Sequence, residues 1–131
     1  MDKTELSTRF TDTMAKFTAY FGKHLPDDVL AKLKEMRTLQ DTPLAKVMYD
    51  SMFTDLELAD KFNVPFCQDT GVIQYWIECG SEFPLIGQMQ ECLREATIRA
   101  TKEAPLRHNA VQIFDEKNTG NNTGVRIPWI D

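Results

Sequence analysis

The first part of the chain carries apolar residues at helical spacing. Leu6, Phe10, Met14, Phe17 and Phe21 recur every three or four positions. This spacing places them on one stripe of an α-helix. We therefore expect a helix over residues 4–23, and we expect His24 to interact with its C-terminal end.

Two more helix starts follow. Pro26 precedes Asp27 and Asp28, and acidic side chains in a first turn interact favourably with the helix dipole. Thr42 supplies a capping hydroxyl in front of Pro43, a common first helical residue. The second helix should bury Val29, Leu30, Leu33 and Met36, and the third should end near residue 61.

The rest of the chain mixes strand and helix signals. Residues 72–79 are rich in β-branched and aromatic side chains and predict a strand. Residues 83–103 have helical spacing and precede Pro105, which predicts a fourth helix. Weaker strand signals lie at 110–114 and 126–131. We expect an α+β fold within one domain: a helical N-terminal half followed by a small β-sheet packed with a long helix.

Charge and hydropathy limit the kinds of partner that we expect for this protein. The formal net charge is -5 and the pI is about 5.0, which argues against nucleic acid because phosphate binding needs clustered Lys and Arg. A small anionic substrate would need a local cationic group. The first residues lack the layout of a signal peptide, and no apolar run approaches the ~20 residues of a membrane helix. We expect a soluble, cytoplasmic protein without a membrane partner.

The chain has three cysteines, Cys67, Cys79 and Cys92. An odd number without a signal sequence argues against a disulfide framework, and the spacing matches no common zinc pattern. Cys79 ends the expected strand and Cys92 lies near the apolar stripe of the fourth helix. Free cysteine often behaves as a small buried apolar residue, so we favour structural roles for these two.

Cys67, Gln68 and Asp69 are the strongest candidates for chemistry. They combine a soft metal ligand, an amide and a carboxylate in a connection before Gly71. A thiolate beside an acid can bind iron or zinc, or act as a nucleophile. From residue types alone, a buried cysteine followed by an aspartate that caps a turn is the simpler interpretation.

A second candidate group follows Pro105. Arg107 can bind a carboxylate with two parallel hydrogen bonds, and His108 can carry a proton; the alternative is a solvated arginine and a histidine that satisfies backbone groups. The loop at 118–124, with the sequence NTGNNTG, either offers backbone N–H groups to an anion or is a plain connection, which we favour.

These segments together resemble a known family. Residues 65–71, PFCQDTG, look like the first cluster-binding motif of the class I fumarase and tartrate dehydratase family of iron–sulfur hydro-lyases. Residues 104–111, APLRHNAV, are similar to its substrate-arginine segment, and 118–124 followed by Pro128 and Trp129 are similar to the segment after it. The resemblance covers nearly the whole chain. Residues 106–116 look closer to the tartrate dehydratase branch, with class I fumarase as the alternative.

The resemblance implies a four-iron four-sulfur cluster, held by three cysteines, that removes water from a dicarboxylate substrate. Cys67 would be one cluster ligand, Gln68 and Arg107 would bind the substrate, and Asp69 would protonate the departing hydroxyl. Dehydration of L(+)-tartrate to oxaloacetate is the predicted reaction. A partner beta subunit would supply the base.

The resemblance also predicts that the chain is the N-terminal portion of a longer alpha domain. The family's other cluster cysteines lie downstream of the matched region, so we expect no intact cluster on these 131 residues. A non-catalytic binding or regulatory module is the alternative from another functional class. A reading frame that continues beyond Asp131 with two more cysteines would discriminate between them.

Overall fold

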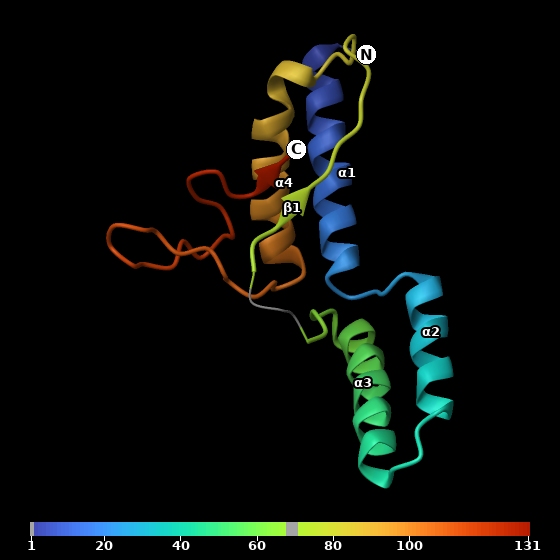
Figure 1. The fold of residues 1–131 in the computed structure, drawn as a ribbon. Helices are drawn as coiled ribbons and strands as arrows, with labels where there is room; N and C mark the ends of the chain where they lie inside the picture. The colour runs from blue at the N-terminus through green and yellow to red at the C-terminus, as the bar shows by residue number, and fades with distance from the viewer. Residues whose placement is uncertain (1, 68–70) are drawn as a thin grey trace.

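The computed structural model describes residues 2–67 and 71–131 (Figure 1). Its helices are α1 (Lys3–Phe21), α2 (Asp27–Thr38), α3 (Pro43–Phe62) and α4 (Met89–Glu103), the last preceded by a 3-10 turn at Ile86–Gln88. The strands are β1 (Gln74–Tyr75) and β2 (Trp129–Ile130). The predicted α+β class is confirmed, and most of the regular structure is helical.

The core lies between α1 and α4, which run side by side (Figure 1). Leu93, Ala96 and Ala100 of α4 are fully buried, and Ala15 and Ala19 of α1 are buried opposite this helix. Alanine side chains at the contact allow the two helix backbones to approach closely. Two residues of the apolar stripe that predicted α1, Phe10 and Met14, pack against the buried cluster of Tyr75, Met89 and Leu93.

A short parallel sheet completes this body. β1 pairs with β2 in the register Gln74 to Trp129 and Tyr75 to Ile130. Parallel strands need a crossover connection, and α4 lies in the segment that joins these two. The strand signal at 126–131 is thus confirmed as β2, and the sheet is held against the helices by Tyr75.

The Tyr75 hydroxyl links both helices of the core. It lies 2.9 Å from Thr18 Oγ1 of α1 and 3.1 Å from Thr97 Oγ1 of α4. Both threonines donate their own protons to carbonyls one turn earlier in their helices, at Met14 and Leu93. The tyrosine must therefore be the donor in this network, and it can satisfy one threonine at a time.

We expect Tyr75→Phe to lower the free energy of unfolding by about 1 kcal/mol, because a buried threonine oxygen loses its donor while the aromatic ring stays packed. Chemical denaturation measures this value. Tyr49→Phe on α3 is the matched control, with no comparable loss expected. Equal effects of the two substitutions would contradict the proposed importance of the Tyr75 hydroxyl.

The α2–α3 hairpin extends away from the α1–α4 body (Figure 1). Its helix starts follow the prediction: Pro26 is the N-cap of α2, and Thr42 caps α3 by accepting a hydrogen bond from the Ala45 N–H. The predicted buried face is wrong, since α2 has no buried residue, Val29 and Met36 are exposed, and Leu30 and Leu33 are only half-buried.

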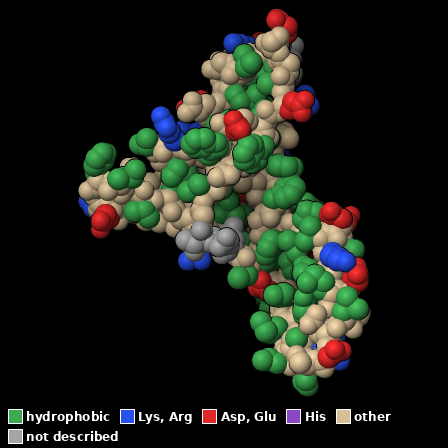
Figure 2. Space-filling model, in the orientation of Figure 1, with side chains coloured by type: hydrophobic (Ala, Val, Ile, Leu, Met, Phe, Trp, Pro, Cys, Tyr) green, Lys and Arg blue, Asp and Glu red, His purple; other side chains and the backbone are tan. Residues whose placement is uncertain are grey.

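Apolar side chains gather over the hairpin surface (Figure 2). Periodicity identifies which face of a helix can be buried, but burial also requires an element to pack against it. Among the described residues, α3 packs on α2 and no other helix makes a comparable contact with it. The hairpin is joined to the body at its base, where Asn63 accepts a hydrogen bond from Lys23 Nζ and donates one to the Glu103 carbonyl.

An ion pair connects the two helices of the hairpin. Arg37 Nε lies 2.7 Å from Asp50 Oδ1, and Arg37 Nη2 lies 3.1 Å from Asp50 Oδ2. The hydrogen bond from Arg37 holds the pKa of Asp50 below its ordinary value. Because the folded pKa is lowered, the pair contributes to stability above the ordinary aspartate pKa, and the contribution is lost as the pH falls through the lowered value.

We expect Arg37→Ala to raise the pKa of Asp50 back toward its ordinary value, because the guanidinium donors are removed. An NMR titration of the Asp50 carboxyl carbon measures the change. Lys32→Ala is the control on the same helix, since Lys32 pairs with Glu35 instead. An unchanged Asp50 titration in Arg37→Ala would show that the arginine is not the cause.

Several boundaries differ from the sequence prediction. The strand expected at 72–79 is limited to Gln74–Tyr75 because β2 offers it only two paired residues. Residues 110–114 form no strand: Val111 makes an isolated bridge with Asn118, and Phe114 is fully exposed. The fourth helix begins at Met89 instead of 83. None of the described helices has the length and apolar character needed to cross a membrane.

Candidate functional site

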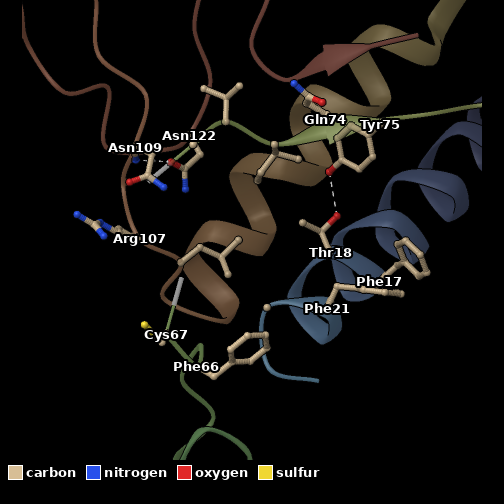
Figure 3. Close-up of a pocket in the computed structure, with 15 residues that line it drawn as sticks. Phe17, Thr18, Phe21, Phe66, Cys67, Gln74, Tyr75, Arg107, Asn109 and Asn122 are labelled. Carbon is tan, nitrogen blue, oxygen red and sulfur yellow. Dashed lines mark hydrogen bonds between the residues drawn. The ribbon is translucent and has the colours of Figure 1, made fainter. Parts of the chain in front are cut away.

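A cavity of about 670 Å³ opens where the end of α1 meets residues 66–67, 71–75 and 106–109 (Figure 3). Phe17, Phe21 and Phe66 form part of its apolar lining, together with Tyr75. The apolar stripe of α1 thus ends on a cavity wall, and this explains why Phe17 and Phe21 are about half exposed. Polar side chains occupy the opposite side.

Cys67 lies on the lining of this cavity and is exposed. The chain reaches it after α3 ends at Phe62, where the left-handed backbone of the C-cap Asn63 turns the chain. The Phe66 N–H then donates to the Gly22 carbonyl, and the Cys67 N–H donates to Asp55 Oδ2 at 2.9 Å. The interpretation of Cys67 as a buried structural cysteine is therefore wrong.

Arg107 lines the same cavity from the segment that follows α4. Its neighbour Leu106 is buried, and the Leu106 N–H donates to the Thr101 carbonyl at 3.3 Å. The Arg107 side chain is exposed, and Figure 3 shows its guanidinium on the same side of the cavity as the Cys67 sulfur. The fold thus brings together a thiol and a guanidinium from distant parts of the chain.

Two of the predicted site residues, Gln68 and Asp69, lie outside the described residues. Cys67 and Gly71, which flank them in the sequence, both line the cavity. His108 is exposed and is not among the lining residues. Its backbone carbonyl accepts a hydrogen bond from Asn118 Nδ2 at 2.7 Å.

The remaining histidine and cysteines have other surroundings. His24 Nδ1 lies 3.0 Å from the Tyr20 carbonyl at the end of α1, as predicted. Cys92 is buried and lies 3.2 Å from Ser7 Oγ, in keeping with a structural role. Cys79 is exposed, so its predicted burial is wrong; the strand that would have covered it ends at Tyr75.

The described residues fit only part of a cluster site. Within residues 2–67 and 71–131, no group of three or more His, Cys, Asp or Glu side chains could hold a metal ion. Cys67 is the cysteine on the cavity lining, and an exposed thiolate is a suitable ligand for iron. The donor set therefore fits one corner of an iron–sulfur cluster.

Sequence reasoning missed two residues of the polar side, Asn109 and Asn122. The Asn109 N–H donates to Asn122 Oδ1 at 2.8 Å, and Asn122 is buried with a left-handed backbone at φ 58°. An asparagine in a loop with several glycines is a known signal for that conformation. The pattern identified the loop correctly as a turn-rich connection, but not what its side chains bind.

Comparisons with known proteins agree on one family. The family model described as fumarate hydratase (Fumerase) matches residues 11–131. The L(+)-tartrate dehydratase subunit alpha of Escherichia coli (strain K12) is 44% identical over 129 residues, which cover 98% of this chain and 43% of the relative. The putative L(+)-tartrate dehydratase subunit alpha of Methanocaldococcus jannaschii is 27% identical over 125 residues, covering 94% of this chain and 44% of that protein. The chain spans less than half the length of these relatives.

Proposed function

We propose, because the chain belongs to the fumarate hydratase (Fumerase) family, that it forms part of the alpha subunit of an iron–sulfur hydro-lyase that converts L(+)-tartrate to oxaloacetate and water. The observation that carries the proposal is the placement of Cys67 and Arg107 on one cavity. The similarity to tartrate dehydratase alpha subunits supports the choice of substrate.

Arg107 binds a carboxylate of the substrate. Its guanidinium is cationic and offers two parallel N–H donors that match the two oxygens of a carboxylate. This local charge counteracts the overall charge of -5, which would otherwise repel a dianion. The apolar lining contributed by Phe21 and Phe66 excludes water from one side of the cavity and strengthens that interaction.

Cys67 contributes one thiolate ligand to a four-iron four-sulfur cluster, and the other ligands come from outside the described residues. The cluster, when bound, supplies a Lewis-acidic iron that polarises the bond to the departing hydroxyl. Gln68 donates a hydrogen bond that orients the substrate. Asp69 holds a proton on its carboxyl group and transfers it to the hydroxyl as that group leaves.

The remaining proton transfer is assigned to a partner. A base removes the proton from the substrate carbon next to the carboxylate, and loss of water leaves an enol that becomes oxaloacetate. We assign this base to a beta subunit, as the name of the alpha-subunit relatives implies a second chain. Co-purification of a beta subunit with the natural polypeptide that carries this chain would support the assignment.

A second candidate is fumarate hydratase, which interconverts malate and fumarate. The description of the matching family model favours it. The two reactions differ in one substrate hydroxyl, and both use a carboxylate clamp and a departing hydroxyl. Arg107 and Asp69 would therefore have the same roles in either enzyme.

A substrate comparison tests the proposal. The natural polypeptide that carries this chain is produced anaerobically with its beta partner and reconstituted with iron and sulfide. L-tartrate, D-tartrate, malate and fumarate are then offered separately. Oxaloacetate from L-tartrate is the expected result. Turnover of malate and fumarate alone would establish the second candidate, and no turnover with the cluster in place would exclude a hydro-lyase.

A further inference from the structure

The peptide unit between His108 and Asn109, one residue beyond Arg107, is held from both sides by asparagine side chains. The Asn109 N–H donates to Asn122 Oδ1 at 2.8 Å, and the His108 carbonyl accepts from Asn118 Nδ2 at 2.7 Å. These two groups belong to the same peptide bond, the one that directly follows the Arg107–His108 unit. Both asparagines come from the loop at 118–124.

We propose that Asn118 and Asn122 are positioning residues for Arg107: together they fix the His108–Asn109 peptide, one residue beyond Arg107, so that the guanidinium is presented to the substrate carboxylate in one orientation. The inference rests on the proposed function, because it assumes that Arg107 binds the substrate. It adds two residues that act through the backbone of the Arg107 segment. Asn122 also lines the cavity, whereas Asn118 does not, so Asn118→Ala tests positioning without loss of a cavity-lining side chain.

Asn122 is anchored in the core. Its side chain is buried, and Nδ2 donates to Thr101 Oγ1 of α4 at 3.2 Å. Thr101 Oγ1 in turn donates to the Thr97 carbonyl at 2.8 Å. A continuous chain of hydrogen bonds therefore leads from the most buried part of α4 to the Asn109 N–H. Such support limits movement of the loop that carries Arg107.

Asn118 holds the other side of the His108–Asn109 peptide from an exposed position in the loop. Its Oδ1 accepts the Gly120 N–H at 2.8 Å, which holds the side chain in a tight turn and aims Nδ2 at the His108 carbonyl. The Thr119 N–H also donates to the Ala110 carbonyl at 2.9 Å. The loop thus binds the segment after Arg107 at three consecutive residues.

The residue before Arg107 is also fixed. Leu106 is buried, and its N–H donates to the Thr101 carbonyl. Thr101 therefore supports both sides of Arg107: its carbonyl holds Leu106, and its hydroxyl holds Asn122. Two parallel hydrogen bonds to a carboxylate tolerate little change in angle, so a backbone that is fixed on both sides favours substrate binding.

The backbone of Asn122 decides which variants are informative. At φ 58° an alanine would be strained, whereas glycine adopts this conformation without strain. Asn122→Gly therefore removes the hydrogen bond to the Asn109 N–H and leaves the turn intact. Asn118→Ala removes the hydrogen bond to the His108 carbonyl. Because Asn118 is exposed, the variant should still fold.

Asn121→Ala is the matched control. Asn121 lies in the same loop, and its Oδ1 accepts hydrogen bonds from the Thr123 N–H and the Thr123 hydroxyl. Within residues 2–67 and 71–131, the hydrogen bonds given for its side chain are to Thr123 and not to the His108–Asn109 peptide. Asn121→Ala removes hydrogen bonds within the loop but keeps those from Asn118 and Asn122 to the His108–Asn109 peptide. The variant therefore separates general damage to the loop from an effect on the position of Arg107.

The test measures KM and kcat for L-tartrate, malate and fumarate, and amide hydrogen exchange at 107–110, in the reconstituted natural enzyme. One neutral hydrogen bond to the peptide is lost in each variant, so we expect KM to rise, with smaller changes in kcat. The rise should be roughly tenfold in Asn122→Gly, because Asn122 is buried, and about threefold in Asn118→Ala, because Asn118 is exposed to water. Exchange at Asn109 should be faster in Asn122→Gly. Asn121→Ala should keep the KM of the parent.

Three results would overturn the inference. An unchanged KM in both variants, with the parent enzyme active, removes the positioning role and leaves the proposed function standing. A rise of KM in Asn121→Ala equal to that in Asn118→Ala attributes the effect to loop damage. An inactive parent with its cluster in place removes the proposed function and, with it, the inference.

Discussion

Replacement of Cys67 by Ser is expected to abolish both cluster binding and dehydratase activity in the complete enzyme. A serine hydroxyl is a hard, protonated group at neutral pH, whereas iron–sulfur clusters are held by thiolates. Cys67 is exposed on the cavity that also contains Arg107, so no repacking of a core complicates the substitution. Iron and sulfide content, together with the visible absorption of the anaerobic protein, measure the loss.

Cys79→Ser is the control for this prediction. Cys79 is also exposed but does not line the cavity, so the variant should keep its iron, its sulfide and its activity. The Cys67 N–H interaction with Asp55 involves the backbone and survives in Cys67→Ser. Full iron content and turnover in Cys67→Ser would refute the assignment of this residue as a cluster ligand.

Replacement of Arg107 by Lys is expected to raise the KM for L-tartrate while kcat changes little. Lysine keeps the charge but loses the planar pair of donors. A hydrogen bond to a charged group contributes about 1.5–3 kcal/mol, so loss of one predicts a rise of roughly 10- to 100-fold. Arg107→Ala, which also removes the charge, should have a larger effect. Steady-state kinetics on the reconstituted enzyme measure both parameters.

The control is Arg126→Lys, since Arg126 is exposed and lies outside the cavity lining. Its KM should match that of the parent enzyme. If Arg107→Lys and Arg126→Lys have the same KM, Arg107 does not bind the substrate carboxylate in two-point fashion. A fall in kcat with constant KM would instead place the interaction of Arg107 in the transition state alone.

Local signals predicted the helices well. The caps at Thr42 and Pro26, the acidic first turn of α2 and the helix-ending Pro105 depend on neighbours within a few residues, and such interactions are readable from a short window. The strand predictions were less successful. Residues 110–114 have the composition of a strand, but the chain turns back at 112–117, where the Gln112 N–H donates to the Lys117 carbonyl.

The sequence predicted which residue types line the candidate site, but not which residues hold them in place by hydrogen bonds. Motif resemblance selected Cys67 and Arg107, and the fold places both on one cavity. Resemblance also proposed Gln68 and Asp69, which lie outside the described residues and stay predictions. The roles of Asn118 and Asn122 were not predictable, because an asparagine in a loop indicates a turn and does not specify a distant hydrogen-bond partner.

Sequence pattern alone was sufficient for the α+β class and for most helix starts and ends, the start of α4 excepted, because these follow from side-chain type and from contacts over one or two helical turns. The three-dimensional packing was needed to establish which apolar faces are buried, which strands pair and what holds Arg107. Val29 and Met36 have the spacing of a buried face yet are exposed, while Ala96 and Ala100 are fully buried. Burial and hydrogen bonding between segments depend on which residues meet in space, and no local pattern contains that information.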